Sequence, residues 1–192
     1  MNRRLFVALD PPEAVRRRIA TAVAALRRSA GRAADEVRWT AVETLHLTLQ
    51  FLGAVPEERI AALDDAVRAA AAAARPLQLE LRGAGGFPNA RRPRVVWLGL
   101  SGDLAPLSAL AEDLGRRLTP LGFPPEARPF TPHLTIGRAR DSRGAPGIGG
   151  ALAEASQGEG IGWRAAELVL FESHLEPGGA RHEPLLRAPL GG

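Results

Sequence analysis

The chain has 192 residues, a mass of 20.4 kDa and a formal net charge of +4, and 45% of its residues are hydrophobic. That size suffices for one domain or two small lobes with a buried core that needs no metal or disulfide support. Disulfides and thiolate metal sites are excluded because there is no cysteine, and no apolar run approaches the ~20 residues of a membrane helix. We expect a cytoplasmic protein without a membrane partner.

The basic residues are all arginine, 25 in number. Without Lys or Tyr, little titrates between neutrality and arginine, so the sequence pI of about 11.1 overstates the net charge. Two interpretations stay open, namely a bias in genomic base composition and a mild preference for polyanions.

The first part of the chain predicts a strand and then a helix. Leu5–Leu9 is a short apolar run typical of a buried strand, and Asp10, followed by two prolines and Glu13, predicts a capped helix start. Apolar residues at helical spacing continue to Leu26. The arginines on the remaining helix face fit either a solvated surface or RNA contact.

A strand, a helix, a strand and a loop are expected next. Residues 37–39 lead toward the first His-x-Thr segment, whose strand is expected to extend to about Phe51, and residues 57–74 predict an alanine-rich helix. Alternating leucines predict a half-buried strand at 77–82. Residues 83–93 then predict a flexible loop, whose neighbourhood holds the best candidate basic patch, made of Arg91, Arg92 and Arg94.

The second half repeats the order of the first. A buried strand at 95–100 leads to a helix from about Asp103, then to a strand at 132–136, a weak helix at 151–157 and a strand at 165–172. This order indicates gene duplication, giving two α/β lobes related by approximate twofold symmetry around a central cleft.

One motif occupies equivalent places in the two halves. Leu45-His46-Leu47-Thr48-Leu49 is matched later by Pro132-His133-Leu134-Thr135-Ile136. One His-x-Thr is roughly a 4% coincidence at this threonine content, too weak alone, but two copies that each precede an aliphatic residue fall below roughly 1%. Alternation along a strand places each histidine and its threonine on one face.

Two imidazoles and two hydroxyls at one cleft define a narrow chemistry. One histidine can act as general base and the other as general acid near neutral pH. A threonine hydroxyl can donate to a phosphoryl oxygen. The set fits in-line attack of water on a cyclic phosphodiester, with His46 and His133 catalytic and Thr48 and Thr135 binding phosphate. Symmetry alone does not say which histidine is the base.

Two other uses of the histidine pair stay open. Zinc would need a third ligand, and no acidic residue lies at a companion spacing in either motif, so no metal is expected. Alternatively, both histidines belong to the core. His174 and His182 have no partner pattern and are interpreted as surface or packing residues, whereas Glu43 and Glu172 are expected to be solvated.

These segments resemble the two-histidine phosphoesterase superfamily, and within it the RNA 2′,3′-cyclic phosphodiesterases, also named RNA 2′-5′ ligases. The resemblance covers nearly the whole chain and lies in Arg4-Leu5-Phe6-Val7-Ala8, His46-Leu47-Thr48-Leu49 with Phe51-Leu52-Gly53, Arg92-Pro93-Arg94-Val95-Val96-Trp97-Leu98, and Pro132-His133-Leu134-Thr135-Ile136-Gly137-Arg138. It implies one bilobal domain over residues 1–192, with two intertwined lobes and two mainly antiparallel sheets flanked by helices.

The resemblance also implies the reaction, which is metal-independent hydrolysis of an RNA 2′,3′-cyclic phosphate to a 2′-phosphate end, without a cofactor. His133 is then expected to activate water and His46 to protonate the leaving 3′ oxygen. Arg138 is expected to contact phosphate or nucleotide, although its odd offset from His133 would turn it away in an ideal strand. A bulge or a strand end at Gly137, where the family usually has Ala, would bring it back.

The expected partner is RNA ending in a 2′,3′-cyclic phosphate, such as tRNA halves or other RNA fragments, bound by a monomer, with 2′-5′ ligation as a reverse reaction. Two alternatives are a phosphoesterase acting on small cyclic nucleotides and an RNA-binding module without turnover. Phe6, Phe51 and Phe130 lie near the motif strands and could stack a terminal base, but core packing is the simpler interpretation.

Overall fold

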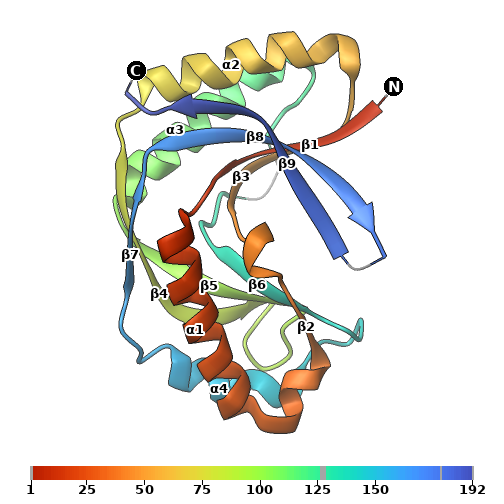
Figure 1. Ribbon diagram of the computed structural model, residues 1–192, viewed down its shortest axis with the longest axis vertical. Coiled ribbons are helices and arrows are strands. Elements are labelled where there is room, and N and C mark those ends of the chain that lie inside the picture. Colours follow the sequence, from red (N-terminus) through yellow and green to blue (C-terminus); the bar gives the residue numbers. More distant parts are fainter. Residues whose placement is uncertain (1, 126–128, 178, 192) are drawn as a thin grey trace.

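The computed structural model describes residues 2–125, 129–177 and 179–191. Two antiparallel sheets lie one above the other in Figure 1. In spatial order, the upper sheet contains β3 (Leu47–Pro56), β1 (Asn2–Leu9), β8 (Glu167–Glu176) and β9 (Gly179–Pro189). The lower sheet contains β2 (Val37–Trp39), β6 (Leu134–Ala139), β5 (Val95–Gly102), β4 (Leu77–Phe87) and β7 (Ile161–Ala165).

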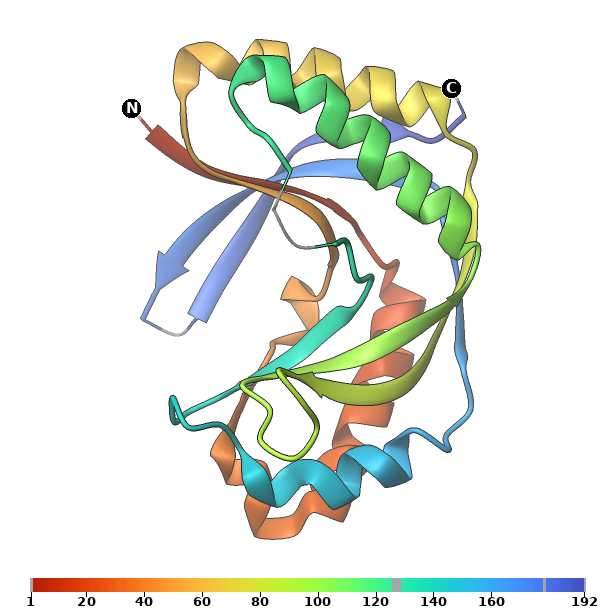
Figure 2. The same ribbon diagram turned by 180° about the vertical axis from the view of Figure 1, so that it is seen from behind.

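Helices cover the outer sides of both sheets (Figures 1 and 2). The upper sheet is covered by α2 (Ile60–Ala73) and α3 (Leu104–Leu118), and the lower by α1 (Glu13–Ala30) and α4 (Gly149–Ala155). The expected α/β fold of two antiparallel sheets with flanking helices is confirmed. Among the described residues, none of the helices combines the length and the apolar character needed to cross a membrane.

The expected repeat is visible in the strand pairing. In the upper sheet β1 lies between β3 and β8, and in the lower sheet β5 lies between β6 and β4, so each half supplies a central strand and a motif strand. The helix that follows β1 lies on the lower sheet, and the helix that follows β5 lies on the upper one (Figure 2). The two halves therefore exchange helices.

Helical spacing explains how α3 covers its sheet. Its inward leucines are spaced three or four residues apart, which places them on one face of a helix. All four are buried, with at most 3% exposure: Leu107, Leu110, Leu114 and Leu118. Burying such a side chain contributes about 1.5–3 kcal/mol.

The expected N-cap of α1 is wrong. The capping position is Pro12, and no side chain caps this helix end. Asp10 forms ion pairs instead, with Arg16 on α1 and, at 2.7 Å, with Arg187 on β9. The carboxylate thereby joins a helix of the lower layer to a strand of the upper one.

The expected loop at 83–93 is also wrong over its first residues. β4 continues to Phe87, with a register shift against β5 between Leu81 and Ala84. A Cβ at Gly85 would lie 2.4 Å from the Trp97 ring, so glycine is needed here for close packing within the strand. The glycines indicated a turn, but here they allow a bulge and a close contact.

Candidate active site

Each motif histidine lies immediately before its strand, held by a backbone carbonyl two residues earlier. His46 Nδ1 lies 2.7 Å from the Thr44 carbonyl oxygen, and His133 Nδ1 lies 2.7 Å from the Thr131 carbonyl oxygen. Because a carbonyl only accepts, Nδ1 must be the donor in both contacts. Each neutral imidazole therefore keeps Nε2 as its free basic nitrogen, in the same orientation relative to the chain.

His46 packs on the face of the upper sheet that points away from α2 and α3. Its ring centroid lies 4.6 Å from that of Phe6 and 5.0 Å from that of His182, which meets it edge-on. Burial lowers the pKa of His46 to about 4, and the Thr44 carbonyl offsets only part of this effect. His46 is therefore neutral at pH 7 in the free protein.

His133 has a different aromatic environment. Its ring centroid lies 4.9 Å from that of Phe87, in an edge-on arrangement, and 6.5 Å from that of Trp97. The two motif strands, β3 and β6, contact each other between the sheets. The histidines are thus equivalent in backbone geometry and unequal in surroundings.

A bulge in β6 determines which face of the strand Arg138 occupies, and such a bulge near Gly137 is one of the arrangements expected from the sequence. Thr135 pairs with Trp97 and Arg138 pairs with Val95, across a register shift in the β5–β6 ladder. Trp97 and Val95 are two residues apart and share a face of β5. Arg138 therefore lies on the same face as Thr135, and it is exposed.

The first motif has the same irregularity. Thr48 pairs with Ala8 and Phe51 pairs with Phe6, with register shifts in the β1–β3 ladder. Phe51 consequently occupies the place in its lobe that Arg138 occupies in the other. It is 53% exposed, whereas Phe6 is 3% exposed and Phe130 packs on the core. Of the three phenylalanines considered for stacking on a nucleobase, Phe51 has the largest exposed fraction of its side chain.

Gly137 is explained by close packing between β6 and β2. A Cβ at this position would lie 2.5 Å from Val37 Cγ1 and 3.2 Å from the Arg38 carbonyl oxygen. An alanine therefore requires a shift of β2, which is the physical reason for glycine here.

We expect Gly137→Ala to destabilise the protein by about 1–3 kcal/mol, because overpacking at a rigid strand contact forces a backbone shift. The measurement is the free energy of unfolding from urea denaturation. Gly162→Ala is the matched control, since a Cβ on that strand glycine meets nothing within 4 Å. Equal stability of Gly137→Ala and the wild type would contradict this account of β2 packing.

A groove of about 340 Å³ lies beside His46. His182 lines it, so the interpretation of this residue as a surface or packing residue missed its place at the site. Burial lowers the pKa of His182, and the Arg181 backbone offsets part of this. The other lining residues are Asp10, Glu13, Arg16, Glu43, Thr44, Leu45, Phe171, Pro184 and Arg187.

His174 and Glu172 lie on the other face of the same sheet. Alternation along β8 turns them away from Phe171 and Ser173. His174 Nε2 lies 3.6 Å from Glu172 Oε2, and Arg3 Nε donates to the same oxygen at 2.9 Å. Glu172 is only 9% exposed, so the expectation that it is solvated is wrong. The hydrogen bond from Arg3 lowers its pKa.

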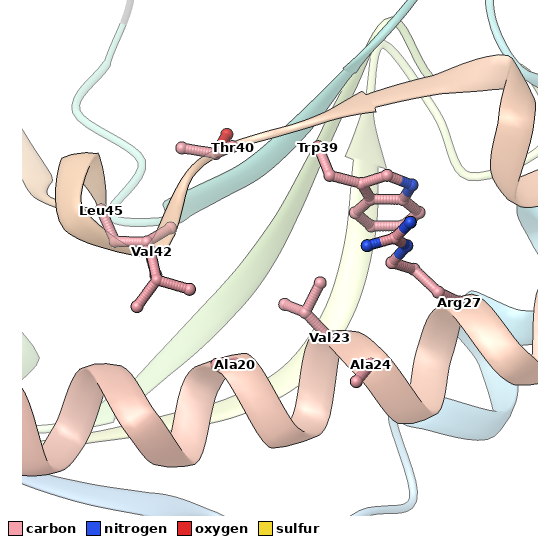
Figure 3. Close-up of a pocket in the computed structure, with 8 residues that line it drawn as sticks. All are labelled: Ala20, Val23, Ala24, Arg27, Trp39, Thr40, Val42 and Leu45. Atoms are coloured by element: carbon pink, nitrogen blue, oxygen red, sulfur yellow. The ribbon is translucent and has the colours of Figure 1, made fainter. Parts of the chain in front are cut away.

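A second cavity, of about 210 Å³, lies between α1 and the segment leading to the first motif (Figure 3). Its walls are mostly apolar, and the Arg27 guanidinium lies 5.8 Å from the Trp39 ring centroid at one end. Arg27 is the only ionisable residue among those lining it, so this cavity offers no acid–base pair. Within the described ranges, no cluster of three or more His, Cys, Asp or Glu could hold a metal ion.

Two antiparallel sheets, each joined to a His-x-Thr motif with the same backbone contact, define a two-histidine class of α/β protein. The chain belongs to the 2′-5′ RNA ligase superfamily, whose model matches residues 11–176. It is 34% identical to an RNA 2′,3′-cyclic phosphodiesterase of Methanothermobacter thermautotrophicus over 93% of this chain and 94% of that one. A Thermus thermophilus protein of the same name is 32% identical over 98% and 91%.

Solved structures show the same fold over the whole length. TT0787 of Thermus thermophilus has a TM-score of 0.78 and 29% identity, with 98% of each chain covered. E. coli LigT complexed with 3′-AMP has a TM-score of 0.76 and 31% identity, with 100% of each chain covered. The two-sheet arrangement is therefore shared with proteins that match this chain from end to end.

Proposed function

We propose that this protein hydrolyses 2′,3′-cyclic phosphate ends of RNA to 2′-phosphate ends, with His46 and His133 as its acid–base pair. The observation that carries this proposal is the identical hold on both histidines, in which Nδ1 donates to a carbonyl and Nε2 stays free. The names of the curated relatives support a cyclic phosphate on RNA as the substrate. Because one chain carries both histidines, the proposed active unit is a monomer acting in the cytoplasm.

The reaction is an in-line displacement at phosphorus. One Nε2 takes a proton from water as the water oxygen bonds to phosphorus. The bond from phosphorus to the ribose 3′ oxygen breaks, and the other histidine delivers a proton to that oxygen. The phosphate remains on the 2′ oxygen. A ribose 5′-hydroxyl in place of water would give 2′-5′ ligation with the same pair.

The threonines and Arg138 stabilise charge on the phosphate. Thr48 pairs with Ala8 and Thr135 pairs with Trp97 on the strands that follow the two histidines, and we assign their hydroxyls as donors to the nonbridging oxygens. The Arg138 guanidinium lies on the face of Thr135 and can pair with the phosphate by two parallel hydrogen bonds. These roles match those implied by the family resemblance.

The low pKa of His46 affects the assignment of the general acid and the general base. We assign His133 as the base and His46 as the acid, so His46 must be protonated in the complex although it is neutral in the free protein at pH 7. A bound phosphate supplies a negative charge beside His46, and an adjacent opposite charge raises the pKa of an imidazole. Substrate binding thus prepares the acid.

The test is incubation of a short RNA ending in a 2′,3′-cyclic phosphate, with EDTA present, followed by identification of the monoester. A 2′-phosphate product supports the proposal in reaction class and regiochemistry. Cyclic mononucleotides assayed in parallel separate an RNA enzyme from a small-molecule phosphoesterase. Tight RNA binding without turnover would replace the proposal with the RNA-binding alternative.

A further inference from the structure

A second arginine lies directly across the ladder from Arg138. β2 and β6 are antiparallel neighbours, and Arg38 is the Cα partner of Arg138. Both side chains are exposed. Directly opposite residues of an antiparallel pair project from the same face with their Cβ atoms about 4.5–5.5 Å apart. The two arginine side chains therefore leave the sheet side by side, from adjacent Cβ atoms on the same face.

The neighbours of Arg38 show which face this is. Val37 is buried, and Trp39 points toward α1, where Arg27 stacks on its ring (Figure 3). Because side chains alternate along a strand, Arg38 points away from α1. The bulge in β6 places Arg138 on the face of Thr135. Arg38 therefore extends the phosphate-binding face outward, to the edge strand of the lower sheet.

No described acidic residue neutralises this pair. The salt bridges of the described residues include neither Arg38 nor Arg138, whereas arginines such as Arg187 are paired. The Glu36 carboxylate, two residues before Arg38, accepts a hydrogen bond from the Gly147 N–H at 3.1 Å. Like charges directly opposite each other destabilise a sheet. Such a pair is suited to a polyanion that places one phosphate at each guanidinium group.

We propose that Arg38 and Arg138 form a subsite for the RNA backbone, in which Arg38 binds a phosphodiester upstream of the cyclic end. This inference rests on the proposed function and sharpens it, because it makes an RNA chain the preferred substrate over a cyclic mononucleotide. Guanidinium groups match phosphate oxygens in a planar, bidentate geometry. A cyclic mononucleotide has a single phosphate and leaves Arg38 without a ligand.

The experiment compares Arg38→Gln and Arg38→Glu with the wild type on two substrates, an RNA hexamer ending in a 2′,3′-cyclic phosphate and 2′,3′-cyclic AMP. We expect Arg38→Gln to raise KM for the hexamer about threefold to fivefold, the loss of one exposed ionic contact. Arg38→Glu should raise it further. The slope of log KM against log salt should fall by about 0.7 for one lost phosphate contact on a single strand. Turnover of cyclic AMP should stay within twofold.

Arg68→Gln is the matched control, because Arg68 is an exposed arginine on α2, outside the upper sheet. This variant also removes one positive charge, but at a site on a different layer from Arg138. The melting temperature of Arg38→Gln should equal or exceed that of the wild type, since repulsion across the ladder is relieved. Equal loss on both substrates, or a hexamer KM that matches the Arg68→Gln value, would overturn the proposal.

A binding measurement separates failure of this inference from failure of the proposed function. The hexamer ending in a 2′-phosphate needs no turnover, and its Kd can be measured by fluorescence anisotropy. Weaker binding by Arg38→Gln than by Arg68→Gln supports the subsite even if the wild type turns over neither cyclic substrate. Equal binding by the two variants contradicts the subsite even if turnover is normal.

Discussion

Replacing either motif histidine with asparagine is expected to lower kcat by about 10²–10⁴-fold, the usual contribution of one general acid or base. Asparagine keeps a donor near the position of Nδ1, so it can still bond the carbonyl of Thr44 or Thr131, and it removes the Nε2 atom that handles the proton. The change therefore tests the chemistry with little effect on the loop that holds the residue. The measurement is kcat for His46→Asn and His133→Asn on the RNA substrate.

His174→Asn is the matched control for these variants. It removes a histidine from the same sheet as His46, but from the opposite face, beside Glu172. Its kcat should equal that of the wild type. Circular dichroism should show the wild-type fold in all three variants. Full activity in either motif variant would remove the acid–base assignment.

Replacing a motif threonine with valine is expected to lower kcat by about 10²–10³-fold, which is typical for loss of one donor that stabilises transition-state charge. Valine has the same shape and β-branching as threonine and lacks only the hydroxyl, so strand packing beside Ala8 or Trp97 is kept. The effect should fall mainly on kcat, because the hydroxyls bond oxygens whose charge grows in the transition state. The measurement is kcat and KM for Thr48→Val and Thr135→Val.

Thr21→Val provides the control, because the Thr21 hydroxyl bonds only the Arg17 carbonyl on the exposed side of α1. This variant should keep wild-type kinetics. If both motif variants retained kcat within twofold, the threonines would have no part in stabilising the phosphate, and Arg138 would carry that role alone.

Much of the fold follows from patterns that depend on local geometry. Helical leucine spacing in α3 and the alternating leucines at the start of β4 each identify one face of one element, and the repeated order of elements predicts the duplicated sheets. The histidine pair is equally visible, because the motif recurs at equivalent places. A longer form, Thr-x-His-x-Thr, also occurs twice and marks Thr44 and Thr131, whose carbonyls hold the imidazoles.

Contacts between distant segments are what the patterns missed. His182 reaches His46 from β9, a strand with no clear periodicity and no counterpart in the first half. Asp10 has the spacing of a helix cap, but Arg187 lies close enough in space to bind it. The importance of Arg38 follows only from its pairing with Arg138, and this pairing joins two segments about a hundred residues apart whose register no local pattern shows.

The pH dependence of kcat/KM and of kcat tests the central claim most directly. The first reports the free protein and the second the complex. For kcat/KM we expect a bell, because the fully protonated pair lacks a base at low pH and the fully deprotonated pair lacks an acid at high pH. The basic limb of kcat should lie at higher pH than the basic limb of kcat/KM, since the bound phosphate raises the pKa of His46, the acid. A flat profile from pH 5 to 9 in both parameters would contradict acid–base catalysis by the two histidines.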